Sequence, residues 1–115
     1  MPRVTITSDA LDELRERIAK HRFPSGIMIL GPLEQDVRAP DSVEEAWMLE
    51  RAYGPAQRWV VDILPLRVID QVPGDSREEL HTEDIEGVRV GVLTTKPEVH
   101  LRVELRGDRI RIIEQ

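Results

Sequence analysis

The sequence predicts an α+β domain, with a mixed or largely antiparallel sheet of about five or six strands and two helices packed on one face. Near the carboxyl terminus, apolar and polar residues alternate on both sides of Gly107-Asp108, which is typical of a β-hairpin. Two segments, near residues 8–22 and 43–53, carry apolar residues at helical spacing. Short apolar runs typical of strands lie between and after them, and this order of elements favours the α+β class.

The first elements are a strand, a helix and a second strand. Residues 3–7 alternate and predict a short strand. We expect the Ser8 hydroxyl to cap the helix that follows by accepting a hydrogen bond from a free amide of its first turn. Asp9 and Asp12 also indicate a helix start, because acidic side chains suit its positive end. That helix ends at residues 22–26, and its apolar arc is formed by Ala10, Leu11, Leu14 and Ile18. The continuous apolar run from Gly26 to Gly31 predicts a strand covered on both faces.

The middle of the chain contains a second helix between loops. Residues 32–41 form an acidic loop with prolines. Ser42 and Glu45 then have the spacing of a capping box, which predicts a helix to about Tyr53. Two strands are expected on either side of Pro65, over residues 59–64 and 66–72.

The last third is expected to be mostly strands. Residues 73–87 are predicted to form an acidic connection, with one helical turn around residues 76–80. A strand follows over residues 88–93, and then the hairpin completes the chain.

Composition limits the class of protein. The 115 residues suit a single domain spanning 1–115, and its core must be built from aliphatic residues because only 3% are aromatic. The net charge of −6 argues against general affinity for nucleic acid or for an anionic membrane. No apolar run is long enough to span a bilayer, and the amino terminus lacks the pattern of a signal peptide. We therefore expect a cytoplasmic protein.

The absence of cysteine excludes disulfides, thiolate nucleophiles and metal or iron–sulfur sites built on thiolates. His81 with Glu83 and Asp84 supplies atoms that bind metals, but without a diagnostic spacing, so we expect no metal and no cofactor. Asparagine is also absent, and arginine far outnumbers lysine. This bias is consistent with a thermophilic source, although a GC-rich genome produces a similar one.

The best candidate binding site is the polar side of the terminal hairpin. If its apolar residues face the core, four arginines project to the other side: Arg102, Arg106, Arg109 and Arg111. Guanidinium groups gathered in this way suit a phosphate, a carboxylate or an acidic partner. The alternative is a solvated face whose arginines pair with Glu104 and neighbouring acids.

A second candidate is Glu50, which falls within the apolar arc of the second helix. A carboxylate that is buried there would have a raised pKa and would suit proton transfer, with Arg58 or His21 nearby. The alternative is a glutamate at the rim of the core that reaches water or pairs with an arginine. The helix is apolar on more than one face, so Met48 is a candidate for a dimer contact or a pocket wall.

Two segments resemble the HesB/IscA-like domain of the A-type iron–sulfur carriers. Val4-Thr5-Ile6-Thr7-Ser8-Asp9-Ala10-Leu11-Asp12-Glu13-Leu14 is similar to the strand, Thr-rich cap and amphipathic helix that open that domain, and Gly87-Val88-Arg89-Val90-Gly91-Val92 to its later Gly-Val-Lys-Val strand. The family holds its cluster through cysteines, whereas the corresponding region here is Leu30-Gly31-Pro32-Leu33-Glu34. The resemblance therefore implies a HesB-like fold without cluster chemistry, and no family site is carried over.

The sequence favours a non-enzymatic domain that works by protein–protein contact, as a small homo-oligomer. Two alternatives remain open. One is a module that binds a small anion through the Arg-rich hairpin, and the other is an enzyme that uses Glu50 as a general acid or base.

Overall fold

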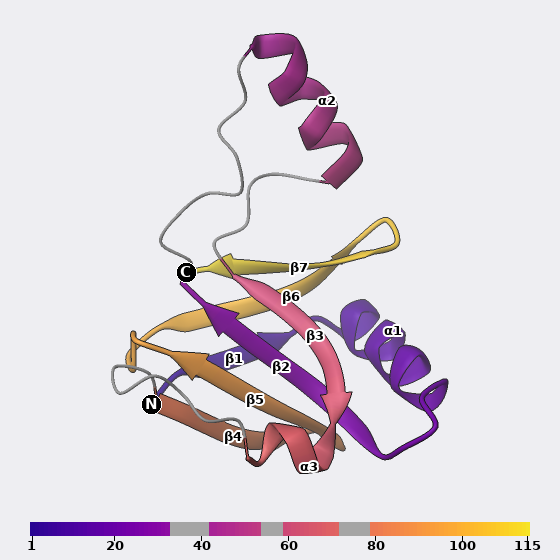
Figure 1. Ribbon diagram of the computed structural model, residues 1–115, viewed down its shortest axis with the longest axis vertical. Helices are drawn as coiled ribbons and strands as arrows, with labels where there is room; N and C mark the ends of the chain where they lie inside the picture. Colours follow the sequence, from indigo (N-terminus) through magenta and orange to yellow (C-terminus); the bar gives the residue numbers. More distant parts are fainter. Residues whose placement is uncertain (33–41, 54–58, 72–78) are drawn as a thin grey trace.

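The computed structural model describes residues 1–32, 42–53, 59–71 and 79–115, apart from five side chains of the second helix: Ala46, Leu49, Glu50, Ala52 and Tyr53. Within these residues the chain forms three helices and seven strands, and the strands are arranged in two sheets (Figure 1). The α+β class and the terminal hairpin are confirmed. The number of strands is higher than the sequence indicated, and they do not form one sheet.

Sheet A has the order β1-β6-β7. β1 (Arg3–Ile6) is parallel to β6 (His100–Arg106), which pairs antiparallel with β7 (Arg109–Glu114). The β6–β7 turn has a positive φ of 65° at Gly107, as a tight two-residue hairpin turn requires. The hairpin therefore has the turn and the register that its alternation predicts.

Sheet B has the order β3-β2-β5-β4. Its central strands, β2 (Ser25–Gly31) and β5 (Val88–Thr94), are parallel, and both are buried over most of their length. β3 (Val60–Pro65) and β4 (Glu79–Ile85) flank them antiparallel. The sequence of β2 is a continuous apolar run because the strand is central in the sheet and both of its faces are covered.

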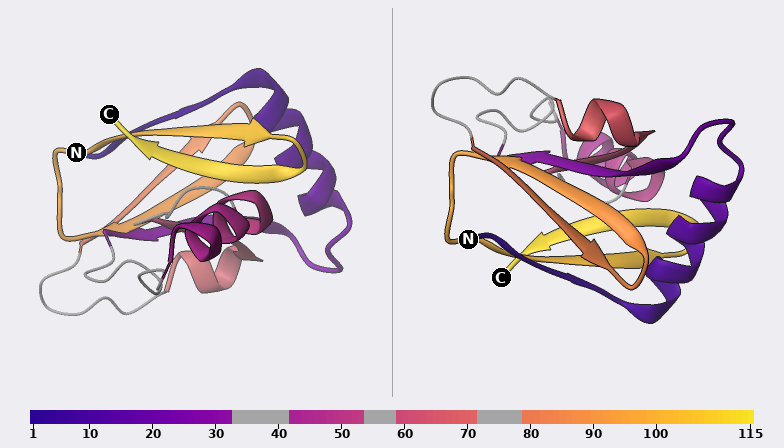
Figure 2. Two further views of the ribbon diagram at one scale, coloured as in Figure 1. Left: turned by 90° about the horizontal axis from the view of Figure 1, so that it is seen from above. Right: turned by 90° about the horizontal axis from the view of Figure 1, so that it is seen from below.

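The main core lies between the two sheets, with α1 (Ser8–Ala19) closing one end (Figure 2). Aliphatic residues supply nearly all of this core, as the composition predicts. The fully buried members come from both sheets and from the helix: Ala10, Ile27, Ile29, Val90, Leu101 and Val103. The shared core fixes which face of each sheet points inward.

The other two helices are placed differently from one another. α3 (Leu66–Ile69) covers the outer face of sheet B, where it forms a second apolar cluster around Ile69, Met28 and Leu93. α2 (Val43–Tyr53) stands away from both sheets (Figure 1). The sequence predicted two helices on one face of a sheet. That arrangement is wrong, because α1 packs at one end of the main core, α3 packs on the outer face of sheet B, and α2 stands away from both sheets. No helix of the described residues is long and apolar enough to cross a bilayer.

The strand predicted over residues 66–72 is wrong, because Leu66 begins α3. Pro65 precedes the helix with extended geometry, and the Leu66 amide donates to the Pro24 carbonyl at 3.0 Å. Leu66 and Ile69, three residues apart, both join the cluster over sheet B. That spacing suits one turn of helix and places two apolar side chains on a single face.

The acidic connection predicted over residues 73–87 contains a strand that the sequence did not indicate. β4 is an edge strand, and its charged residues lie on both faces, so it lacks a clean apolar alternation. The helical turn predicted at 76–80 lies mostly outside the described residues, but Glu79 and Leu80 already belong to β4.

The helix caps are confirmed in part. Ser42 Oγ accepts a hydrogen bond from the Glu45 amide at 3.1 Å, as half of the predicted capping box. At α1 the N-cap is Thr7 rather than Ser8, without a side-chain cap bond. Instead the Thr7 hydroxyl donates to Asp9 Oδ1 at 2.6 Å, and this bond is the main cause that lowers the pKa of Asp9 below its ordinary value.

Candidate functional site

The outer face of sheet A is formed by residues that alternate with the core positions of three strands. In β6 and β7, the cross-strand pairs Arg102–Ile113, Glu104–Arg111 and Arg106–Arg109 lie on this face. β1 adds Arg3 beside His100 and Thr5 beside Arg102. We call this surface the basic face, and it consists of Arg3, Thr5, His100, Arg102, Glu104, Arg106, Arg109, Arg111 and Ile113.

The core dictates this orientation. Leu101, Val103 and Ile112 are buried between the sheets, and successive strand residues point to opposite faces. Burying each such side chain contributes on the order of 1.5–3 kcal/mol, so a register slip that turned them outward is strongly disfavoured. The four predicted arginines therefore lie together opposite the core, and whether they bind an anion stays a prediction.

The basic face carries five arginines and a histidine against one glutamate. The single acid, Glu104, is held beside Arg102, with 3.7 Å between Oε2 and Nε. His100 Nε2 lies 3.2 Å from the Thr5 hydroxyl. Arg111 Nε is buried without a hydrogen-bond partner in the described part of the chain. Among the side chains that form the basic face, positively charged groups therefore outnumber carboxylates.

No described helix covers the basic face. Both views of Figure 2 show sheet A edge-on, with α1 at one end and α3 beyond sheet B on the opposite side of the molecule. Arg102, Arg106 and Arg109 are exposed. In a protein with a net charge of −6, the basic face is therefore a local exception to the overall charge.

The sequence did not indicate that Arg3 belongs to this surface. Arg3 lies on a strand that was predicted, but its place beside β6 depends on a parallel pairing between the two ends of the chain. Parallel pairs need a long connection, and no local turn signal marks them. His100 lies on the same face because it alternates with the buried Leu101.

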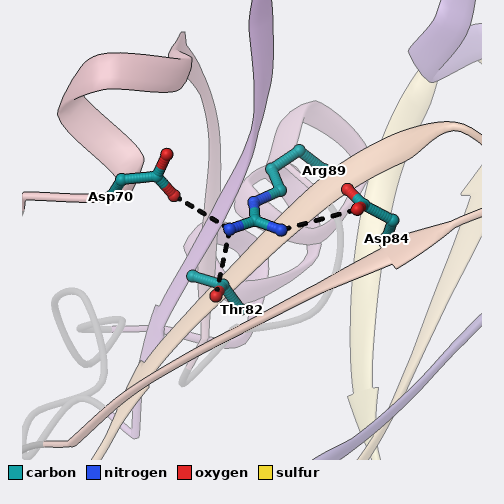
Figure 3. Close-up of polar contacts among 4 residues, drawn as sticks. All are labelled: Asp70, Thr82, Asp84 and Arg89. Atoms are coloured by element: carbon teal, nitrogen blue, oxygen red, sulfur yellow. Dashed lines mark hydrogen bonds and ion pairs between the residues drawn. The ribbon is translucent and has the colours of Figure 1, made fainter.

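A second polar cluster lies on the outer side of sheet B (Figure 3). The Arg89 guanidinium donates to Asp70 at 3.1 Å, to Thr82 at 3.3 Å and to Asp84 at 3.5 Å. The hydrogen bond to Asp70 is the largest cause that raises the pKa of Arg89 above its ordinary value. Asp70 follows α3, so the cluster ties the end of that helix to β5 and β4. Its arginine is already occupied, which makes the cluster structural.

The acid–base candidate is not placed by the structure. Glu50 belongs to α2, but its side chain is outside the described residues, and so is Arg58. His21 is exposed just beyond the end of α1, where its amide donates to the Ile18 carbonyl at 3.0 Å. The enzyme alternative therefore stays a prediction.

The histidine and acid grouping of β4 does not form a metal site. His81 Nε2 lies 3.5 Å from Glu79 Oε2, and His81 and Asp84 point to opposite faces of the strand. In the part of the chain that the structure describes, no group of three histidine, aspartate or glutamate residues is arranged to hold a metal ion.

Comparison with known proteins finds no matching family model, no matching curated protein and no matching solved structure. The resemblance to the HesB/IscA-like domain stays a prediction of the sequence. The basic face is thus interpreted from its own geometry and charge.

Proposed function

We propose that this domain is a non-enzymatic interaction module of the cytoplasm that docks an acidic segment of a partner protein on the basic face. The observation that carries the proposal is the excess of guanidinium groups on one side of sheet A, a side that no described helix covers. Arginine binds carboxylates in a planar, bidentate geometry, and its charge persists at any physiological pH. The rigid sheet holds the arginines in a fixed pattern, which reduces the entropy lost on binding.

The spacing of the charges suits an extended acidic peptide. Residues two apart on a strand are separated by about 6.5–7 Å, and neighbouring strands by about 4.8 Å. Arg102 and Arg106 are four residues apart on β6, and Arg109 and Arg111 are two apart on β7. An extended segment with acids at alternate positions has the same repeat, so several of its carboxylates reach arginines at once.

A nucleic-acid partner fits less well. Apart from the His100 imidazole, the basic face has no ring on which a base would stack, and base stacking is a main term in single-strand binding. The net charge of −6 repels a long polyanion beyond the face itself. A short acidic segment avoids most of that repulsion.

One observation favours the small-anion alternative. Arg106 and Arg109 are direct cross-strand partners beside the turn. Two guanidinium groups held side by side suit the binding of one anion by both. The binding experiment therefore includes inorganic phosphate as a competing ligand.

The proposal is tested with a fluorescent peptide of alternating Glu and Val residues, and binding is measured by anisotropy. We expect Arg106→Gln combined with Arg109→Gln to weaken binding about tenfold or more, because two charge-assisted contacts are lost. Arg22→Gln combined with Arg67→Gln is the matched control, since it changes the net charge equally at exposed positions outside the basic face. The control is expected to bind within about twofold of the parent protein.

Several outcomes would contradict the proposal. Equal losses in the two double variants would show an effect of net charge alone. Equal binding of a peptide with Lys in place of Glu would show that carboxylates are not recognised. Phosphate that displaces the peptide at equal concentration would support the small-anion module instead, and tighter binding of a single-stranded oligonucleotide would support a nucleic-acid partner.

A further inference from the structure

The helix α2 presents large apolar side chains to solvent. The exposed fractions are 86% for Val43, 59% for Trp47 and 66% for Met48. Figure 1 shows α2 beyond the β7 end of the molecule, away from both sheets. Apolar side chains gathered on one element in this way mark an interaction site more often than an ordinary surface.

An isolated helix of this length is not stable by itself. α2 has eleven residues, and helices shorter than about 12–15 residues are marginal in water without packing. Packing of its exposed side against another surface would therefore stabilise it.

The exposed side of α2 has a regular pattern. Glu44, Trp47, Met48 and Arg51 follow one another at the spacing i, i+3, i+4 and i+7, which places them on one stripe of the helix. The four side chains are all exposed. The Arg51 guanidinium lies over the Trp47 ring, 4.6 Å from its centroid, so the apolar centre continues directly into the positive end of the stripe.

This stripe is complementary to itself when two copies run antiparallel. A two-fold axis between Trp47 and Met48 places Glu44 of each helix beside Arg51 of the other, at both ends of the contact. The apolar pair is then covered at the centre, and the helix dipoles oppose one another favourably. A parallel pairing in register would instead bring Glu44 against Glu44.

We infer that α2 is a self-association element that pairs antiparallel with α2 of a second copy of this chain, with Trp47 and Met48 at the centre and Glu44–Arg51 ion pairs at both ends. Such a contact is isologous, so it closes as a dimer. One helix pair buries less than the roughly 1,600 Å² of a standard interface, so the dimer is weak, with a dissociation constant in the micromolar range or above. This inference is independent of the proposed function of the basic face.

Sedimentation velocity on the full chain, at concentrations from about 10 to 500 µM, measures the dimer directly. Trp47→Ser is expected to leave a monomer at every concentration, whereas Phe23→Ser, at another exposed aromatic residue, is the control that keeps the dimer. Tryptophan emission gives a second readout. The emission of Trp47 should shift to shorter wavelength as the concentration rises, because the dimer would bury its ring. Trp59 is already buried in the core, so its emission should not change.

Charge exchange tests the antiparallel register. Glu44→Arg alone or Arg51→Glu alone is expected to weaken the dimer about tenfold, since like charges then meet at both ends. The two substitutions combined in one chain should restore the parent affinity within about threefold, and so should a mixture of the two single variants. Circular dichroism checks that each variant keeps its helix content.

Three results would overturn the inference: a strict monomer over the whole concentration range, a dimer that survives Trp47→Ser, or single charge variants that the exchange does not rescue. The first would mean that α2 is covered within its own chain or by another protein. The last would mean that the helices meet in another register. None of these results bears on the basic face, so the two proposals can fail separately.

Discussion

Replacing Ile69 by alanine is expected to destabilise the protein strongly, although the residue belongs to a helix of only four residues. Ile69 is fully buried between α3 and sheet B, with Met28 and Leu93 around it. Glycines lie beneath it, since a Cβ added to Gly91 would be 2.8 Å from Ile69 Cγ2, and one added to Gly26 would be 3.0 Å from Ile69 Cδ1. No neighbouring side chain at those positions is able to fill the space that the substitution leaves.

The size of the stability loss depends on how little the surrounding structure is able to move into the cavity that Ile69→Ala leaves. Ile→Ala substitutions in cores cost about 2–5 kcal/mol, and the cost rises with the volume of the remaining cavity. The Leu66 amide bonded to Pro24 and the Asp70 carboxylate bonded to Arg89 hold α3 at both ends, so the helix resists moving inward. We therefore expect a loss of about 3–4 kcal/mol.

Urea denaturation followed by circular dichroism measures this loss. With a slope of about 1.5–2 kcal/mol per molar urea, the midpoint should fall by about 2 M. Val68→Ala on the same helical turn is the control, because Val68 is 38% exposed and its truncation should cost about 1 kcal/mol or less. Equal midpoints for the two variants would refute the packing of α3 on sheet B.

Three further predictions concern single positions. Gly91→Ala should destabilise the protein by about 1–3 kcal/mol in the same urea assay, because the new Cβ would lie 2.8 Å from Ile69 Cγ2, and an unchanged midpoint would contradict this close packing. Glu86→Asn should raise the stability by about 0.5–1 kcal/mol, since Glu86 has a φ of 46° that asparagine tolerates better; a loss of stability would contradict that reason. NMR titration should give Asp9 a pKa below 3.8, and Thr7→Val should return it toward that value, because the Thr7 hydroxyl is the main cause of the shift. Because folding lowers the pKa of Asp9, the stability linked to this group is present above its unfolded pKa and is lost as the pH falls through its folded pKa. If Thr7→Val leaves the pKa of Asp9 unchanged, another group causes the shift.

Local patterns in the sequence predicted the elements whose structure is decided locally. The terminal hairpin follows from strict alternation around Gly107, and β2 follows from an unbroken apolar run. The β6–β7 register determines the face on which Arg102 and its neighbours lie, because the alternating apolar residues are buried in the core on the other face.

The features that the sequence did not predict depend on contacts between distant segments. The apolar pattern of residues 66–69 is compatible with a strand and with a helix. The packing of Leu66 and Ile69 in the cluster over sheet B favours the helix. β4 is stabilised at the edge by its pairing with β5, despite a polar composition. The division into two sheets depends on β1 pairing with β6 across almost the whole chain, which no local signal marks.

The contribution of Arg3 to the basic face depends on the same long-range pairing. Sequence reasoning placed the arginines of β6 and β7 together, but it could not add a residue from the amino-terminal strand. The site is therefore larger than the hairpin and spans all three strands of sheet A.

The most direct test of the account is an NMR titration of the labelled protein with the acidic Glu-Val peptide. We predict that the amide shifts concentrate on β1, β6 and β7, and that they shrink as salt is added, because screening weakens exposed charge pairs. Shifts that concentrate on α2 or on the outer side of sheet B, or no shifts at low salt, would contradict the claim that the basic face is the binding surface.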